Sequence, residues 1–279
     1  MIKRALALEG GGLRGIYTAG VLESFLEAGI EFPYIIGVSA GVGYGCSYVS
    51  KQPGRNLAVL VGYRNDRRYL SLWSYIKTGN YFGLDFIYGD IPLTLIPFDI
   101  KTFIDSPVRF VTVCTDCTSG EAVYFEKNKD ILTVMKASSA LPYASKMVEY
   151  QGRKFLDGAI SDAIPLKRAI ADGFTHTVTI LTQPKGFRKK EEYHPPDFLF
   201  YRNYPRLSAA LKTRVRRYNE SLDFAVSEAE GGRNIIIQPS QDLGVTRTEK
   251  SVPKLVSLYE LGKKDGKQAL PLITGRTTL

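Results

Sequence analysis

Residues 4–41 read RALALEGGGLRGIYTAGVLESFLEAGIEFPYIIGVSAG, and this stretch decides the fold. A short apolar run ends at Gly10–Gly12, an apolar pattern of helical spacing covers residues 16–29, and a second apolar run covers Tyr34–Val38. Another helix is expected directly after Ser39. Strand, helix and strand in this order form a βαβ unit, whose strands are parallel neighbours with a right-handed crossover. The glycine cluster and Ser39 are therefore expected at the same edge of a sheet.

The rest of the chain continues this α/β pattern. Further strands are predicted at Val108–Thr115, Ala122–Phe125, Val148–Tyr150, Lys154–Leu156, His176–Thr182 and Asn234–Gln238. Helices are predicted at Ile131–Ser138, 206–230 and 253–271, and residues 56–104 are expected to be mostly helical and loop-like, with a long excursion at Asn80–Pro97. The sequence predicts a three-layer α/β fold with a mainly parallel central sheet flanked by helices. We expect a single domain over 1–279, with a basic helical C-terminal part from about residue 185.

Composition limits the class of protein. Hydrophobic residues make up 44% and charged residues 23% of the chain, which is typical of a soluble globular protein. The opening Met1–Leu8 is too short for the apolar core of a signal peptide, so it is interpreted as a strand and a cytoplasmic protein is expected. Cys114 and Cys117 have the spacing of a metal or redox half-site, but the three cysteines provide no second pair. No metal ion and no cofactor are expected.

The net charge of +9 is concentrated in one stretch. Residues 185–217 contain ten lysines and arginines and three acidic residues, with aromatic residues such as Phe200 and Tyr201 among them. Such a stretch forms either a solvated face or a surface for peripheral contact with an anionic membrane, and the aromatic residues suit the membrane. A role in binding nucleic acid is not expected, because no known binding module accompanies the charge.

Gly37-Val38-Ser39-Ala40-Gly41 fits the G-x-S-x-G nucleophile elbow. In this motif a strained turn from strand to helix holds the serine oxygen at the edge of the sheet, and the two glycines make room for close packing. The motif alone is only moderately specific. Its position between an apolar strand and a helix makes Ser39 the candidate nucleophile.

Gly10-Gly11-Gly12-Leu13-Arg14-Gly15 is a second candidate element. Glycines allow several backbone N–H groups to point at one position, as an oxyanion requires, and the following helix adds its positive end. The same letters match the dinucleotide fingerprint G-x-G-x-x-G, which needs an acidic residue at the end of the second strand. Glu31 lies before that strand, at the wrong end, so the oxyanion interpretation is favoured.

Asp157-Gly158-Ala159 follows a short predicted strand and by itself indicates only a turn. The three motifs in this order resemble those of the patatin-like phospholipases, and the resemblance runs from residue 4 to about residue 183. The remainder of the chain is similar to a bacterial subgroup of that family. Ala159 replaces a glycine that many members have.

The resemblance implies a serine acyl hydrolase in which an aspartate activates the serine without histidine. Ser39 would be the nucleophile and Asp157 the general base. The loop Gly10, Gly11, Gly12 and Arg14 would bind the oxyanion, with the amide of Ala40 as a further donor. The implied substrate is a fatty-acid carboxylic ester, in a phospholipid or lysophospholipid. Because an ordinary aspartate is a weak base, Asp157 is expected in a poorly solvated cleft within hydrogen-bond reach of Ser39.

Two alternatives remain open at this point. One is a Ser-Asp-His esterase, in which His176 or His194 completes a triad with Ser39 and Asp157. The other is a non-catalytic membrane-binding module that uses the basic stretch 185–217, with Ser39 as a relic. Ser138 and Asp116 are expected to be hydrogen bonders that support loops and turns.

Overall fold

The computed structural model describes residues 4–190 and 197–275. In this part of the chain, eight strands form one sheet in the order β5-β6-β3-β2-β1-β7-β8, with β4 paired to β3. The strands are β1 (Ala5–Leu8), β2 (Tyr34–Val38), β3 (Arg109–Asp116), β4 (Ala122–Glu126), β5 (Val148–Tyr150), β6 (Arg153–Asp157), β7 (Thr177–Ile180) and β8 (Asn234–Ile237). The pairs formed among β1, β2, β3, β7 and β8 are parallel, whereas the pairs that involve β4, β5 or β6 are antiparallel. The prediction of a mainly parallel sheet is confirmed.

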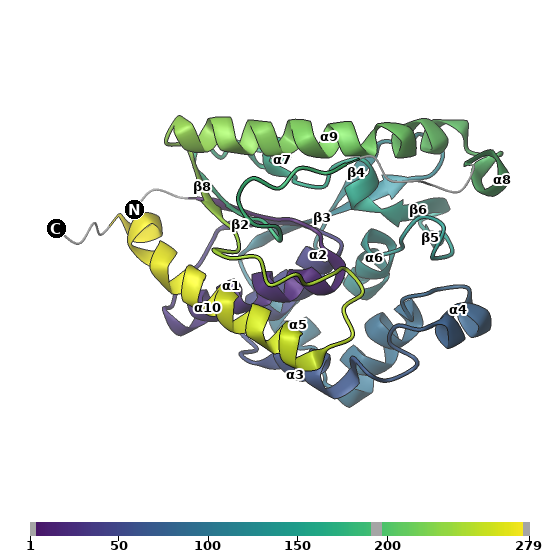
Figure 1. The fold of residues 1–279 in the computed structure, drawn as a ribbon, viewed down its shortest axis with the longest axis horizontal. Coiled ribbons are helices and arrows are strands. Elements are labelled where there is room, and N and C mark those ends of the chain that lie inside the picture. Colours follow the sequence, from purple (N-terminus) through teal and green to yellow (C-terminus); the bar gives the residue numbers. More distant parts are fainter. Residues whose placement is uncertain (1–3, 191–196, 276–279) are drawn as a thin grey trace.

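Helices cover both faces of the sheet (Figure 1). The α-helices are α1 (Ile16–Glu27), α2 (Ala40–Val49), α3 (Arg55–Tyr63), α4 (Leu72–Thr78), α5 (Ile100–Asp105), α6 (Ile131–Ser138), α7 (Leu166–Ala171), α8 (Asp197–Tyr201), α9 (Pro205–Glu230) and α10 (Val252–Thr274). Short segments of other helix types are η1 (Gly12–Gly15), η2 (Phe86–Leu95) and η3 (Gly158–Ile160). Helices α7 and α9 lie on one face, and α1 and α2 lie on the other with α10 packed on α1. The three-layer α/β architecture is confirmed.

The parallel strands are buried on both faces, which explains why their sequences are continuous apolar runs. In β1, Leu6 and Leu8 belong to the large core that includes α1, α2 and α10. Ala5 and Ala7 point to the opposite face, where they pack with Ala169 of α7. Because successive side chains of a strand alternate between faces, one four-residue run supplies both cores.

Strand β3 has neighbours along both edges, and this pairing positions the ends of two other strands. While β4 occupies one edge, β2 pairs along the other as far as Val113, which lies opposite Val38. Strand β6 pairs from the next residue onward, with Asp157 opposite Cys114. The ends of β2 and β6 therefore meet along β3. Ser39, the residue after β2, is brought next to Asp157 by the register of the sheet.

The C-terminal third contributes to the same sheet and core. Strand β8 extends the sheet beyond β7, and α10 packs along α1. The Tyr17 hydroxyl of α1 donates to Asp265 Oδ2 of α10 at 2.9 Å, and the Tyr218 hydroxyl of α9 donates to Glu9 Oε1 at 2.8 Å. These buried hydrogen bonds connect the two ends of the chain. That residues 1–279 form one domain stays a prediction.

The sequence did not predict all helices. The excursion Asn80–Pro97 contains the π-helix η2, although Gly89 and Pro92 lie within it. Both residue types disfavour helix, but Phe86 and Ile91 are buried in the core, and tertiary packing overrides local propensity. None of the helices in residues 4–190 and 197–275 combines the length and the apolar character that a membrane span needs.

Candidate active site

Ser39 occupies a strained turn between β2 and α2. Its backbone has φ 54° and ψ −126°, a conformation that non-glycine residues rarely adopt. The neighbouring packing is tight, because a Cβ atom on Gly41 would lie 2.8 Å from the carbonyl oxygen of Glu9. The backbone N–H of Ser39 donates to Ser138 Oγ at 2.8 Å, and Ser138 Oγ in turn donates to the Val113 carbonyl at 2.6 Å. Residues of both α6 and the sheet thus hold the turn at Ser39 in place.

Asp157 lies within hydrogen-bond reach of this serine. The Ser39 hydroxyl donates to Asp157 Oδ2 at 2.8 Å, and the N–H of Ala159 donates to Oδ1 at 2.8 Å. The carbonyl of Asp157 accepts from Thr115 Oγ1 at 2.9 Å. Asp157 is 2% exposed, so the carboxylate is buried and held by neighbours on both oxygens.

Burial makes this carboxylate more basic than an ordinary aspartate. Desolvation raises the pKa of Asp157 to about 6, against the hydrogen bonds from Ala159 and Ser39 and the positive charges of Lys189 and Arg247. A higher pKa reduces the difference in proton affinity between the carboxylate and the serine hydroxyl. The geometry and the electrostatics both suit proton transfer between these two side chains.

The glycine cluster lies beside Ser39. A Cβ atom on Gly10 would lie 3.0 Å from Ser39 Cβ, so a side chain at this position would crowd the serine. Among the described residues, the amides of Gly11, Gly12 and Ala40 have no acceptor, whereas the amide of Leu13 donates to the Arg247 carbonyl at 3.0 Å. The loop therefore offers backbone donors near the serine.

Arg14 lies close enough to Glu9 for its charge to act on that carboxylate. Its positive charge lowers the pKa of Glu9, which burial raises. Glu9 is itself held by the N–H of Thr182 at 2.5 Å and by the Tyr218 hydroxyl at 2.8 Å. Arg14 does not belong to the cavity wall described below. The structure thus places Arg14 beside the acid that anchors the loop.

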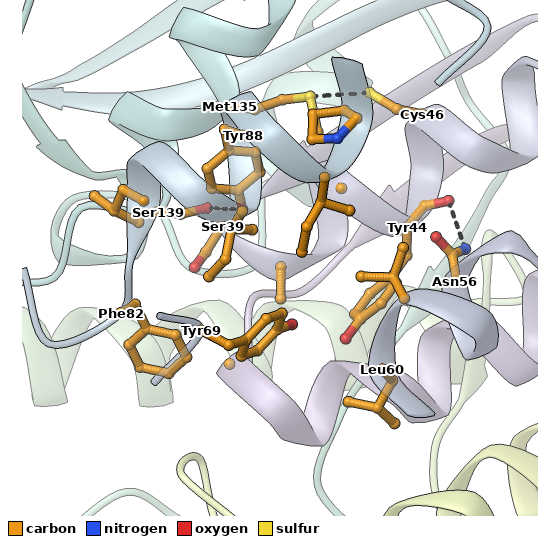
Figure 2. Close-up of a pocket in the computed structure, with 18 of the residues that line it drawn as sticks. Ser39, Tyr44, Cys46, Asn56, Leu60, Tyr69, Phe82, Tyr88, Met135 and Ser139 are labelled. Atoms are coloured by element: carbon orange, nitrogen blue, oxygen red, sulfur yellow. Dashed lines mark hydrogen bonds between the residues drawn. The ribbon is translucent and has the colours of Figure 1, made fainter. Parts of the chain in front are cut away.

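A mostly apolar cavity of about 950 Å³, including its open mouth, adjoins Ser39. Figure 2 shows Ser39 and Tyr88 on one side, with Tyr44, Tyr69, Leu60 and Phe82 around the space. Ala40 and Gly12 also contribute to the wall. The cavity has the lining of a site for a largely apolar ligand.

The histidine alternative is wrong for His176. The register pairs Ala5 with both Tyr34 and Thr177, so His176 precedes the strand at the edge opposite Ser39. Four residues at about 3.3 Å each put these edges on the order of 13 Å apart. His194 lies outside the described residues.

Other candidate residues have structural partners. Cys114 and Cys117 are free and buried, and the described residues contain no group of three or more His, Cys, Asp or Glu that could hold a metal ion. Asp116 accepts from the N–H of Ser119 at 2.7 Å and forms an ion pair with Arg153, as expected for a residue that supports a turn.

Sequence reasoning did not identify the two residues that brace the pair. Ser138 was expected only to form hydrogen bonds, and its partner, the N–H of Ser39, could not be predicted across 99 residues. Thr115 ends a predicted strand, but its bond to the carbonyl of Asp157 depends on the register of β3 and β6. No local signal in the sequence indicates either contact.

A strained serine at the end of a strand, next to a buried carboxylate and an apolar cavity, is an arrangement that suits a hydrolase of lipids. Residues 6–170, more than half of the chain, match the family model for patatin-like phospholipases. The chain therefore belongs to the patatin-like phospholipase family. Residues 204–275 match a second model, a domain of unknown function called DUF6363.

Individual proteins that are similar to this chain include two uncharacterized bacterial relatives and one solved structure. The chain is 28% identical to the uncharacterized protein YjjU of Escherichia coli over 282 aligned positions, which cover 96% of this chain and 77% of YjjU. It is also 28% identical over 165 positions to the uncharacterized NTE family protein Rv1063c of Mycobacterium tuberculosis, covering 58% of this chain and 44% of that protein. The crystal structure of VipD from Legionella pneumophila aligns with a TM-score of 0.47 and 14% identity, covering 99% of this chain and 67% of VipD.

Proposed function

We propose that the protein is a lipid acyl hydrolase of the phospholipase A or lysophospholipase type, with Ser39 as nucleophile and Asp157 as base. The hydrogen bond of 2.8 Å between Ser39 Oγ and Asp157 Oδ2, at the wall of an apolar cavity, carries the proposal. It combines a nucleophile, a base and a space for an acyl chain. Family membership supports the same class of reaction.

In the acylation step, Asp157 accepts the proton of the Ser39 hydroxyl while Ser39 Oγ attacks the carbonyl carbon of the ester. The carbonyl oxygen becomes an oxyanion, and the amides of Gly11, Gly12 and Ala40 are the proposed donors to it. When the intermediate collapses, the C–O bond to the alcohol breaks and the alcohol takes the proton from Asp157. Water then releases the fatty acid by the reverse sequence.

A histidine is not required for this mechanism if the carboxylate is basic enough. With a pKa of about 6, Asp157 is ionised at neutral pH and accepts a proton more readily than a solvated aspartate does. Ser138 keeps the N–H of Ser39 occupied, so the proposed oxyanion donors lie on the next residue and on the glycine loop. The charge that develops would lie at a largely buried position, since Ser39 is 7% exposed.

The acyl chain of the substrate would occupy the cavity described above. The wall combines aliphatic and aromatic side chains from α2, α3, η2 and α6, which suits a hydrocarbon chain. The hydroxyl groups of Tyr88 and Ser139 bond to each other at 2.7 Å, so they present little polar character to a ligand. Binding energy from this remote part of the substrate would position the ester next to Ser39.

The test is hydrolysis of long-chain acyl esters and lysophospholipids by the purified protein, with the products identified by mass spectrometry. Ser39→Ala and Asp157→Asn are each expected to lower kcat/KM by at least about 10³-fold. His176→Ala and His194→Ala are the controls and should retain full activity. Unimpaired hydrolysis by Ser39→Ala would refute the proposal, and loss of activity in His194→Ala would favour a triad.

A further inference from the structure

Helix α4 is the tip of an excursion whose base forms part of the cavity wall. An isolated bridge between Leu70 and Phe82 closes this base. The N–H of Ser71 donates to the Tyr81 carbonyl at 3.1 Å, and the N–H of Gly83 donates to the Tyr69 carbonyl at 2.9 Å. Because Tyr69 and Phe82 line the cavity, the exposed tip and the cavity wall belong to one structural unit.

The tip presents large apolar side chains to solvent. Ser74 is buried and faces the excursion, whereas Leu72 is 70% and Ile76 is 80% exposed. Trp73 and Tyr75 of the same helix are also exposed. Most of the Leu72 and Ile76 side chains therefore stays in contact with water after folding. Large exposed apolar patches on monomeric proteins often mark an interaction site.

A second exposed apolar helix lies at the same end of the molecule. Helices α4 and α8 both project at the right of the view in Figure 1. The loop between α6 and β5 connects them, because the Ala144 carbonyl accepts from the N–H of Tyr81 at 2.7 Å, and the rings of Tyr143 and Phe200 lie 5.4 Å apart. Leu199 and Phe200 of α8 are 65% and 51% exposed. The exposed apolar residues Leu72, Trp73, Tyr75, Ile76, Leu199 and Phe200 are called the apolar rim.

Positive charges surround the apolar rim. The Arg67 guanidinium lies 4.6 Å from the centroid of the Trp73 ring. Lys77 on α4, Lys146 on the connecting loop and Arg202 after α8 are exposed. Arg202 belongs to the basic stretch 185–217, so that stretch contributes part of this fringe.

We propose that the apolar rim docks on a lipid bilayer that carries anionic headgroups. Exposed aliphatic side chains enter the boundary between headgroups and acyl chains, while tryptophan and tyrosine side chains favour that boundary. The basic fringe is complementary to anionic headgroups, which attract cations near the membrane surface. Docking would place the excursion that lines the cavity against the membrane. Only this last consequence rests on the proposed function.

The test measures binding of the inactive Ser39→Ala protein to sedimented vesicles, so that no hydrolysis changes the lipid. Vesicles of phosphatidylcholine are compared with vesicles that also contain phosphatidylglycerol. Adding Leu72→Asp and Ile76→Asp together is expected to weaken binding at least about tenfold, because two apolar side chains no longer enter the bilayer. Adding Lys77→Gln and Lys146→Gln together should reduce the preference for anionic vesicles by about tenfold or more.

Leu272→Asp is the matched control, since Leu272 is 62% exposed on α10, away from the rim. It introduces the same charge and should leave vesicle binding unchanged. Thermal unfolding of each variant establishes that it is folded.

Equal vesicle binding by the Leu72→Asp/Ile76→Asp variant and the parent would overturn the proposal. A second outcome would also overturn it. If the parent forms a dimer, the Leu72→Asp/Ile76→Asp variant is monomeric and neither protein binds vesicles, then the apolar rim contacts a second copy of the chain. Failure of ester hydrolysis would refute the proposed function and leave the vesicle result intact.

Discussion

The sheet edge that holds Ser39 and Asp157 differs in construction from residues 50–107, which form much of the cavity wall. At the sheet edge, strand register and hydrogen bonds fix each polar group, and Asp157 has partners on both carboxylate oxygens. In residues 50–107, helices α3, α4 and α5 and the π-helix η2 pack through apolar side chains, and α4 leaves several of them in solvent. Under the proposed function, the first region carries out the reaction and the second selects the molecule that enters the cavity. Changes at the sheet edge should therefore alter the rate, whereas changes in the second region should alter selectivity.

Lower pH should reduce activity by protonating Asp157 at the sheet edge. Asp157 must be ionised to accept a proton, and its pKa is raised to about 6, so lower pH removes the active form. We expect kcat/KM for a soluble short-chain ester to fall about tenfold per pH unit below that value, or about 100-fold at two units below. A pH–rate profile on the folded protein measures this. A profile that stays flat through this range would show that Asp157 is not the base.

Ser138→Ala tests whether the second layer of the sheet edge affects the rate. Loss of this hydroxyl leaves the N–H of Ser39 and the Val113 carbonyl without a buried partner, which should destabilise the protein by about 1–3 kcal/mol. The nucleophile turn would also relax, so kcat should fall about 10- to 100-fold with little change in KM. Ser24→Ala removes another buried serine hydroxyl, far from the site, and should change stability only. A change in KM with an unchanged kcat would contradict a positioning role for Ser138.

Asp157→Asn should separate stability from activity at the same position. The raised pKa means that the folded protein binds a proton more tightly than the unfolded chain, so the parent loses stability as pH rises through about 6. An uncharged asparagine avoids this loss, and unfolding at about pH 8 should require roughly 1–3 kcal/mol more than in the parent. The difference should disappear below about pH 4, where the aspartate is protonated in both states. Equal or lower stability of the variant at high pH would mean that the carboxylate hydrogen bonds outweigh desolvation.

The same contrast explains what the sequence could predict. The strands, α1, α2 and the position of the glycine loop beside Ser39 follow from apolar periodicity, because parallel strands end at a common edge. The pairing of Ser39 with Asp157 is implied only by the resemblance of the three motifs to the patatin-like family, since β6 is antiparallel to β3. The π-helix η2 could not be predicted, since Gly89 and Pro92 disfavour a helix that buried Phe86 and Ile91 stabilise only after folding. Ser138 and the cavity wall likewise depend on contacts between distant segments, which no local spacing reveals.

Gly43→Leu should change the cavity and leave the sheet edge intact. Gly43 lines the cavity on α2, and a Cβ atom there would have Met135 Cε at 3.9 Å as its nearest neighbour, so the backbone accepts a side chain. The leucine would fill space that a long acyl chain needs. We expect the ratio of kcat/KM for long- over short-chain esters to fall about tenfold, by analogy with the discrimination of hydrophobic pockets. Gly62→Leu on α3, where a Cβ atom meets no other atom within 4 Å, is the matched control outside the cavity. Equal losses of kcat/KM for long- and short-chain esters would show that the acyl chain does not bind in this cavity.

The smallest expected effect tests whether the two regions and the C-terminal helices unfold together. Tyr218→Phe removes the hydrogen bond from α9 to Glu9, and Tyr17→Phe removes the bond from α1 to Asp265 of α10. Each should lower the free energy of unfolding by about 1 kcal/mol. If residues 1–279 form one cooperative domain, calorimetry will show one transition whose Tm falls in both variants, while exposed Tyr75→Phe leaves it unchanged. Two transitions, with only one of them shifted by each variant, would show that the chain contains two domains that unfold separately. Since Glu9 adjoins the glycine loop, only Tyr218→Phe should also reduce activity, and by no more than a few-fold, because it loosens the loop without removing a donor.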